Sequence, residues 1–217
     1  LILVDAKSPV SFFAYPGKAS DLLPDGCTAH VLSSEQQDAE SSLQRLCNEL
    51  ACDDAQAVLQ IAARPGRPIG RLTVEKVCKA IGHLLPERAI LVDEAQTSGV
   101  FLPSFTAGAP RHDVLTLTGG AIGQGLPNAV GAAIACPDRP VIALAGDGSA
   151  MYTIQALWTM ARERLNVTNI IFNNASYAIL NVELHRVGAS GDGDKARSHL
   201  DLSQPGIDFV QLGNSLG

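Results

Sequence analysis

The sequence has no long apolar run, no excess of positive charge and no pair of cysteines at metal-binding spacing. No stretch approaches the ~20 consecutive apolar residues that a membrane-spanning helix needs. The formal net charge of −6 argues against nucleic acid or an anionic membrane as a partner. The sequence does not begin with methionine, and we expect no signal peptide in it, because the apolar start turns polar at Asp5. We therefore expect a globular protein with no nucleic-acid and no membrane partner.

The five cysteines contain no Cys-x-x-Cys motif and leave an odd count. Reduced and mostly buried thiols in a cytoplasmic protein are the simplest interpretation. A length of 217 residues accommodates one substantial α/β domain and part of another. The chain starts directly in an expected strand and stops inside a helical pattern, so we expect it to be a fragment of a longer protein.

One segment predicts a strand, a turn, a helix and a second strand. Apolar residues fill positions 141–145 and 168–172, and apolar residues at helical spacing cover about 151–164. The crossover in such a βαβ unit makes the two strands parallel. Asp147 and Asn174 then both lie at the carboxyl ends of strands, where open α/β sheets bind ligands.

The side chains at these two strand ends suit a hard cation. Mg²⁺ prefers oxygen ligands and usually combines one or two protein groups with water and phosphate oxygens. Asp147 supplies negative charge, and the side-chain oxygen of Asn174 adds a neutral ligand. Gly146 and Gly148 allow backbone to approach a phosphate closely, and Ser149 with the amides that open the next helix can donate to an anion. The segment therefore predicts a site for Mg²⁺ and phosphate.

Gly146-Asp147-Gly148, followed after a helix and a strand by Asn173-Asn174, resembles the signature of thiamine diphosphate (ThDP) enzymes. The separation of the two motifs suits that family. The resemblance implies that Asp147, Asn174 and the backbone carbonyl of Ser176 hold Mg²⁺ against the diphosphate of the cofactor. The alternative is a glycine turn with a helix-capping aspartate and an unrelated asparagine pair.

A glycine-rich stretch occupies residues 118–127. It lacks the third glycine of the dinucleotide motif Gly-x-Gly-x-x-Gly, because Asn128 stands at that position. It instead resembles the segment of ThDP enzymes that grips the aminopyrimidine ring. The resemblance implies that the Gly120 carbonyl accepts from the exocyclic amine and that Ile122 is the apolar wedge that bends the cofactor. For Ile122 the alternative is an ordinary core side chain.

Three further residues are candidates for binding the diphosphate. Gln96 and Thr97 follow the strand expected at residues 89–92, in a turn that reaches the diphosphate in the resembling family. Capping of the next helix by Thr97 or Ser98 is the alternative. Tyr177 follows the expected metal loop directly and can donate its hydroxyl to the diphosphate. Ordinary packing in the next helix is the alternative for Tyr177.

The expected fold class is α/β: a doubly wound, mostly parallel sheet with helices on both faces, preceded by the tail of a second Rossmann-like domain. Residues 1–64 are assigned to the C-terminal part of that middle domain plus a linker. Residues 65–217 are assigned to a C-terminally truncated ThDP-binding domain. Within the first part, Ser34 and Gln37 resemble a capping box before a helix that runs to about Leu50.

The resemblance implies the cofactor-binding portion of a ThDP- and Mg²⁺-dependent enzyme that decarboxylates or carboligates 2-oxo acids, similar to acetolactate synthase and benzoylformate decarboxylase. Catalytic residues are not assigned, because the family's activating glutamate belongs to an N-terminal pyrimidine-binding domain of a second subunit. Glu94 and Glu183 do not fit that motif. A homodimer or homotetramer is expected at full length, with the fragment inactive alone. Two alternatives remain: a non-catalytic ThDP-fold assembly or regulatory partner, and a nucleotide-binding domain, which the lack of a complete Walker A motif disfavours.

Overall fold

A computed structural model describes residues 1–52, 56–189 and 193–217 of the chain. The described residues form two compact units, Leu1–Leu59 and Gln60–Gly217. In the part of the chain that the structure describes, no helix combines the length and the apolar character needed to cross a membrane.

The first unit contains a small parallel sheet and one helix. Strand β1 (Ile2–Val4) pairs with strand β2 (His30–Ser33), and helix α1 (Ala39–Glu49) follows. Leu3 and Ser33 are buried where the two strands lie side by side. The assignment of this unit to a Rossmann-like domain stays a prediction.

The start of α1 differs from the prediction. Ser34 and Gln37 form the expected local bond, in which the Ser34 backbone N–H donates to Gln37 Oε1 at 2.9 Å. The helix nevertheless begins after them, because the Asp38 carboxylate accepts from Ser41 N at 3.0 Å and from Ser41 Oγ at 2.7 Å. Asp38 is therefore the N-cap, and the predicted capping box is wrong as a helix start. The same bonds lower the pKa of Asp38.

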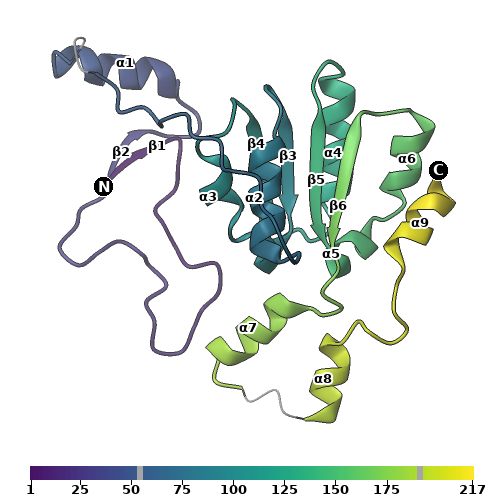
Figure 1. Ribbon diagram of the computed structural model, residues 1–217. Helices are drawn as coiled ribbons and strands as arrows, with labels where there is room; N and C mark the ends of the chain where they lie inside the picture. Colours follow the sequence, from purple (N-terminus) through teal and green to yellow (C-terminus); the bar gives the residue numbers. More distant parts are fainter. Residues whose placement is uncertain (53–55, 190–192) are drawn as a thin grey trace. The chain divides into compact units, whose positions relative to one another are not determined.

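The second unit is built on a four-stranded parallel sheet in the order β4-β3-β5-β6 (Figure 1). Its strands are β3 (Ile90–Glu94), β4 (Asp113–Thr116), β5 (Val141–Gly146) and β6 (Val167–Phe172). The helices are α2 (Val74–Leu84), α3 (Leu102–Thr106), α4 (Gly125–Ala135), α5 (Asp147–Tyr152), α6 (Ala156–Arg162), α7 (Ala178–Arg186), α8 (Asp194–Leu200) and α9 (Phe209–Leu216).

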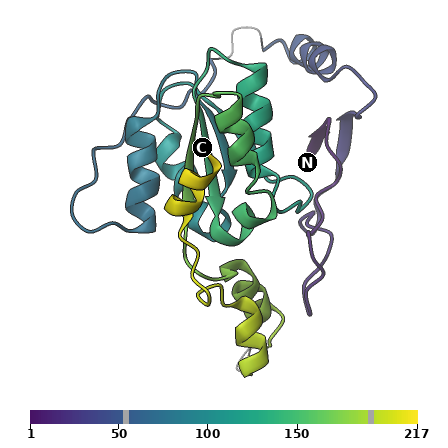
Figure 2. The ribbon, with the colours of Figure 1, turned by 90° about the vertical axis from the view of Figure 1, so that its right-hand side faces the viewer.

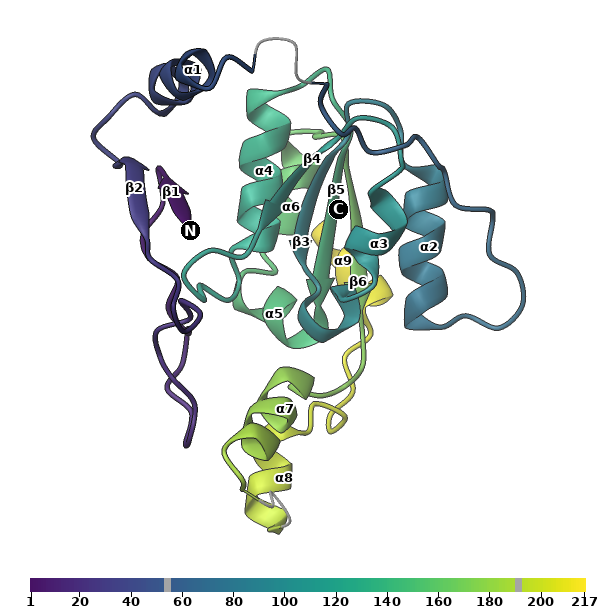
Figure 3. The same cartoon turned by 90° about the vertical axis from the view of Figure 1, so that its left-hand side faces the viewer.

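Helices cover both faces of this sheet. Helices α2 and α3 lie on one face, and α4 and α6 lie on the other, as the two side views show (Figures 2 and 3). Helix α9 packs beside α6. The predicted α/β fold with a parallel sheet between helices is confirmed.

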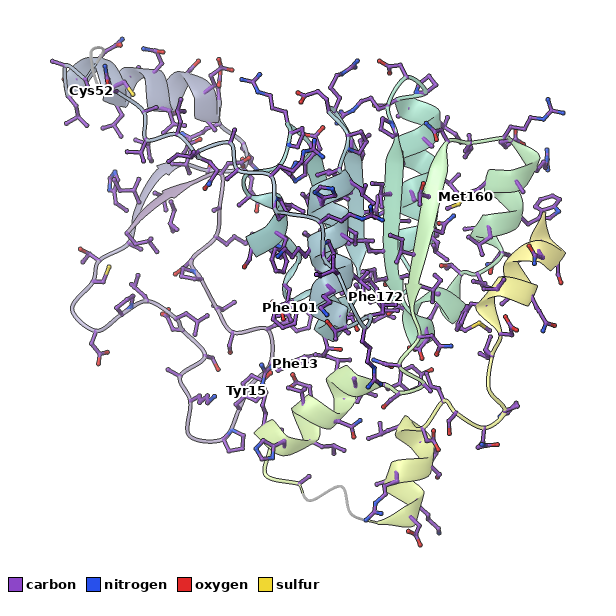
Figure 4. The ribbon with its side chains drawn as sticks, viewed as in Figure 1. Phe13, Tyr15, Cys52, Phe101, Met160 and Phe172 are labelled. Carbon is purple, nitrogen blue, oxygen red and sulfur yellow. The ribbon has the colours of Figure 1, made fainter. Side chains whose placement is uncertain are left out.

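Two apolar clusters hold these layers together. Alternate residues of β5 enter opposite clusters: Ala143 and Ala145 pack toward α4 and α6, whereas Leu144 packs toward α2 and α3. Figure 4 labels one member of each cluster, Met160 on α6 and Phe172 at the end of β6. Because both faces are covered, four of the six residues of β5 are buried and the other two are half-buried, and its sequence is a continuous apolar run.

The sheet has a switch point between β3 and β5. The connection from β3 to β4 passes through α3 on one face, whereas the connection from β5 to β6 passes through α5 and α6 toward the other. The two strands are direct neighbours, with Glu94 opposite Ala145 at their carboxyl ends. Chains that leave neighbouring parallel strands toward opposite faces open a crevice between them, and ligands of open α/β sheets bind there.

The helix predicted at residues 151–164 is wrong in its bounds. The structure has two helices, because α5 already begins at Asp147, directly after β5, and ends before Thr153. Thr153 has φ −142° and ψ 31°, outside the helical region, and its Oγ1 donates to the Gly123 carbonyl at 2.6 Å. A contact with a distant loop therefore interrupts an apolar pattern that is otherwise helical.

Residues 60–68, which the sequence analysis placed mainly in a linker, are attached to the second unit. The Ala63 backbone N–H donates to the Gly108 carbonyl at 2.8 Å, and the Arg64 guanidinium donates to the His83 carbonyl. His83 Nδ1 lies 2.9 Å from the Pro65 carbonyl oxygen. The division between the units, at residues 59 and 60, consequently precedes the predicted boundary at residue 65.

The burial of β5 leads to a first prediction. We expect Leu144→Ala, at a side chain that is 1% exposed, to lower the free energy of unfolding by about 2–5 kcal/mol through lost burial and a residual cavity. Leu115→Ala, on the edge strand β4 at 40% exposure, is the matched control and should cost about 1 kcal/mol or less. Urea denaturation of the 217-residue chain measures both, and equal losses would contradict the assignment of the core.

Candidate cofactor site at the carboxyl edge of the sheet

A pocket lies at the carboxyl ends of β3, β5 and β6. Figure 1 shows α5 and the start of α7 at this end of the sheet. Three chain segments line the pocket: the turn after β3, the start of α5 and the loop between β6 and α7. Its lining residues are Ala95, Gln96, Thr97, Gly146, Asp147, Gly148, Ser149, Asn174, Ser176, Tyr177, Ala178 and Ile179.

The pocket gathers the residues predicted to bind Mg²⁺ and diphosphate, although they come from three different strand ends. These are Gln96, Thr97, Asp147, Gly148, Ser149, Asn174, Ser176 and Tyr177. The residues predicted to grip the pyrimidine, Gly120 and Ile122, are not among its lining residues; they lie on the loop between β4 and α4. The role of each of these residues stays a prediction.

Asp147 is the electrostatic centre of the pocket. Its side chain is buried, and Oδ1 accepts a hydrogen bond from the Gly148 backbone N–H at 2.9 Å. Oδ2 is also buried, but it has no hydrogen-bond partner among the described residues. A buried carboxylate oxygen without a partner is unfavourable by a few kcal/mol, so such atoms are uncommon in folded proteins. A cation at Oδ2 would remove this cost.

The loop after β6 carries two further candidate ligand oxygens, the side-chain oxygen of Asn174 and the backbone carbonyl of Ser176. Asn174 Oδ1 accepts from the Ser176 backbone N–H at 2.9 Å, which fixes the side chain and leaves the second lone pair of that oxygen available. Ala175 between them has φ +54°, a left-handed conformation that a non-glycine residue adopts only when its surroundings hold it. Ser176 Oγ and the Tyr177 N–H both donate to the Leu200 carbonyl, at 3.1 and 2.9 Å. The loop is thus anchored at the end of α8.

Gly148 and Tyr177 are in close contact across the pocket. A Cβ atom placed on Gly148 would lie 2.5 Å from Tyr177 Cε1 and 2.8 Å from Cδ1. The tyrosine ring therefore packs directly on the backbone that follows Asp147, and only glycine leaves room for it. Tyr177 itself occupies the N-cap position of α7.

The turn after β3 holds Gln96 and Thr97 at the pocket. Gln96 has φ +50°, and it begins a short 3₁₀ helix, Gln96–Gly99. Neither this helix nor α3 has a side-chain cap, so the alternative in which Thr97 or Ser98 caps the following helix is wrong. This turn and the Asn174 loop each contain a non-glycine residue with positive φ, and both segments line the same pocket.

Glu94, for which the sequence predicts no role, lies against the glycine-rich loop. Glu94 is 1% exposed, and its two carboxylate oxygens accept from the backbone N–H groups of Gly123 and Gly125, at 2.5 and 2.7 Å. A carboxylate at the end of a fully buried strand requires such donors. That requirement, together with the glycine-rich stretch that follows the neighbouring strand, is the signal from which the contact could have been inferred.

Fold and pocket together define a doubly wound α/β domain with a polar pocket at its switch point. Residues 96–217 match the family described as thiamine pyrophosphate enzyme, C-terminal TPP binding domain. The match covers more than half of the chain, and the chain belongs to this family. Thiamine pyrophosphate is another name for ThDP, so the predicted cofactor class agrees with the family.

Individual relatives agree with this assignment. The chain is 56% identical over 218 residues to "Putative acetolactate synthase large subunit IlvX" of Mycobacterium tuberculosis, a match that covers 100% of this chain and 42% of the relative. It is 36% identical over 152 residues to the benzoylformate decarboxylase of Pseudomonas aeruginosa, covering 68% of this chain and 27% of that enzyme.

The solved structures point the same way. The ThDP-dependent 4-hydroxybenzoylformate decarboxylase of Rhodococcus jostii RHA1 has a TM-score of 0.72 and 27% identity, covering 100% of this chain and 42% of that one. The chain therefore spans less than half of the length of these relatives.

The contact between Gly148 and Tyr177 leads to a second prediction. Gly→Ala inside a helix usually stabilises it by about 0.5–1 kcal/mol. At Gly148 we expect the opposite sign, a loss of about 1–3 kcal/mol, because the new methyl group meets the Tyr177 ring.

Gly146→Ala is the matched control. Gly146 has φ −71° and ψ 154°, and a Cβ there would meet only Ser149 Oγ, at 3.8 Å. The free energy of unfolding of the Gly146→Ala variant should be unchanged or slightly raised. Denaturation followed by the fluorescence of Trp158, the single tryptophan, compares the two variants. A Gly148→Ala variant as stable as Gly146→Ala would contradict the close contact.

Proposed function

We propose that this chain forms the diphosphate- and Mg²⁺-binding part of an enzyme that decarboxylates 2-oxo acids or carboligates them, joining them to a second carbonyl compound. The observation that carries the proposal is Asp147 Oδ2, a buried carboxylate oxygen without a partner among the described residues, at the carboxyl end of β5. The relatives named acetolactate synthase and benzoylformate decarboxylase support the substrate class.

The residues of the pocket fit a divalent cation of the Mg²⁺ type. Asp147 contributes the charged oxygen, and the Asn174 side chain and the Ser176 carbonyl contribute neutral ones, the oxygen-only donor set that Mg²⁺ prefers. One carboxylate with two neutral oxygens leaves positions for phosphate oxygens and water. The cation would also balance the repulsion between the Asp147 carboxylate and a diphosphate.

The surrounding residues fit the diphosphate itself. Gly148 lets the backbone approach a phosphate closely, Ser149 brings backbone and hydroxyl donors to the pocket, and Gln96 and Thr97 bring side-chain donors from the turn after β3. The Tyr177 ring packs on Gly148 and lines the pocket, and its hydroxyl would be a further donor to the diphosphate. In this proposal these residues donate hydrogen bonds to the diphosphate and orient it, and the rest of the cofactor extends toward the glycine-rich loop.

The glycine-rich loop would hold the aminopyrimidine end. The Gly120 carbonyl accepts from the Ile122 N–H at 2.9 Å, and its second lone pair remains for the exocyclic amine. The Ile122 side chain is 37% exposed, which is unusual for a core residue and suits an apolar wedge against a ligand. Bound ThDP supplies the nucleophilic carbon and the electron sink that decarboxylation of a 2-oxo acid needs. This chain holds and orients that group.

The remaining parts of the proposal concern the whole protein. The pyrimidine-activating glutamate would come from an N-terminal domain of a second subunit, so a homodimer or homotetramer is the proposed assembly. Catalytic residues within this chain are not assigned. A cytoplasmic location is proposed because the five cysteines form no Cys-x-x-Cys motif and leave an odd count.

Replacing Asp147 tests the metal site. We expect Asp147→Asn in the full-length protein to weaken Mg²⁺-dependent ThDP binding by about 10- to 100-fold, because a charged ligand worth about 1.5–3 kcal/mol is lost. Raising Mg²⁺ and ThDP together should restore part of the activity. Asp138→Asn is the control, because this exposed aspartate pairs with Arg88 at the opposite edge of the sheet. ThDP titration at fixed low Mg²⁺ measures both variants, and wild-type affinity in Asp147→Asn would remove Asp147 as the anchor.

The isolated 217-residue chain provides a further test. We expect it to bind ThDP weakly and to turn over nothing, because the proposed partner domain covers the pyrimidine. Decarboxylation of pyruvate or benzoylformate by the chain alone would contradict this. If the full-length protein binds ThDP tightly but decarboxylates and joins no 2-oxo acid, the non-catalytic partner becomes the better proposal.

A further inference from the structure

Glu94 makes a bidentate contact with the glycine-rich loop, in which each carboxylate oxygen accepts one backbone N–H. Its Oε1 accepts from the Gly123 N–H at 2.5 Å and its Oε2 accepts from the Gly125 N–H at 2.7 Å. The side chain is 1% exposed, so water does not compete for these bonds. Hydrogen bonds to an ionised carboxylate are shorter and stronger than neutral ones, and two of them fix direction as well as distance.

The loop needs such an anchor because its backbone is intrinsically permissive. Gly119, Gly120 and Gly123 have φ values of +58°, +67° and +91°. Glycines lose more conformational freedom on ordering than other residues, so a loop that contains several is costly to hold in one conformation. Gly125 is also a close approach: a Cβ there would lie 2.6 Å from Glu94 Oε2. The carboxylate therefore packs directly against the loop backbone, and a side chain at Gly125 would collide with it.

A second side chain anchors the same turn from the opposite side. Thr153 Oγ1 donates to the Gly123 carbonyl at 2.6 Å, so both backbone groups of Gly123 are bound by side chains from other elements. A Cβ on Gly123 would also lie 2.5 Å from Tyr152 Cβ. The turn is thus held between the end of β3 and the end of α5.

These two anchors belong to the elements that carry the diphosphate pocket. Glu94 ends β3, two residues before Gln96, and Thr153 follows α5, whose first residue is Asp147. The loop that carries Gly120 and Ile122 is therefore tied to both walls of the pocket. A displacement of the loop would change its distance from the pocket. That distance is what a ligand must span to contact both the loop and the pocket.

We propose that Glu94 is a positioning residue that fixes the glycine-rich loop at a set distance from the diphosphate pocket, with Thr153 as the second anchor. The proposal rests on the proposed function, in which the diphosphate of one ThDP molecule occupies the pocket and its aminopyrimidine contacts the glycine-rich loop. Glu94 itself touches neither group. It acts through the Gly123 and Gly125 amides, which hold the Gly120 carbonyl and the Ile122 side chain in place.

The test compares ThDP with inorganic diphosphate on the full-length protein in saturating Mg²⁺. Glu94→Gln keeps the shape of the side chain but turns an N–H₂ group toward one glycine N–H, which breaks one of the two bonds. We expect ThDP affinity to fall about tenfold or more, while the affinity for inorganic diphosphate changes less than about twofold. Amide hydrogen exchange of residues 118–125, measured without ligand, should become faster in the variant.

Asp93→Asn is the matched control, a carboxylate-to-amide change at the adjacent residue. Asp93 accepts from the Ala95 N–H at 3.0 Å and lies against Gly99 rather than against the glycine-rich loop. Burial raises the pKa of Asp93, and asparagine keeps the shape of the side chain while removing the buried charge. Asparagine can keep the bond to Ala95, and both affinities should stay near wild type.

The outcomes separate this proposal from the function on which it rests. If wild type binds no ThDP, the proposed function fails, and loop exchange in Glu94→Gln alone decides whether Glu94 is the anchor. If wild type binds ThDP but Glu94→Gln leaves both affinities unchanged, or lowers them equally, the positioning role is overturned. If Glu94→Gln does not fold, Thr153→Val is judged by the same criterion, because it removes the bond to the Gly123 carbonyl and keeps the side-chain volume.

Discussion

The parallel pairing of β3 with β5 is the constraint on which the rest of the second unit depends. The pairing aligns the carboxyl ends of both strands, and their chains leave toward opposite faces of the sheet. A crevice at that point follows from topology alone. The adjacent pairing of β5 with β6 brings the Asn174 loop to the same edge. Residues distant in the sequence therefore line one pocket without long loops to carry them.

Asp147 gives this pocket its charge. The start of α5 holds the side chain in a buried position, where one oxygen is bound by Gly148 and the other has no partner among the described residues. Burial of a carboxylate is unfavourable unless something compensates it, and in the proposed function a cation shared with diphosphate is that compensation. Affinity for the metal and affinity for the diphosphate would then be coupled, because the cation attracts both the Asp147 carboxylate and the diphosphate.

Much of this arrangement could be predicted from the sequence, because it depends on short-range patterns. The apolar runs at β5 and β6 indicate two parallel strands, and the polar residues that follow them must then meet at one edge. The break at Thr153 could not be predicted, because it depends on a hydrogen bond to Gly123, thirty positions earlier in the chain. The contact of Glu94 was missed although its burial at a strand end is a signal, because its partners are backbone amides 29 and 31 positions later in the chain. The start of α1 was misplaced because Asp38 competes successfully with Ser34 as the cap.

The most direct test of the central claim is a crystal structure of the full-length protein with ThDP and Mn²⁺ in place of Mg²⁺. The anomalous signal of Mn²⁺ locates the metal independently of the cofactor density. Our account predicts one strong peak within about 2.1–2.3 Å of Asp147 Oδ2, the Asn174 side-chain oxygen and the Ser176 carbonyl, with diphosphate oxygens completing the coordination. A metal bound elsewhere, or ThDP bound with no metal beside Asp147, would contradict it.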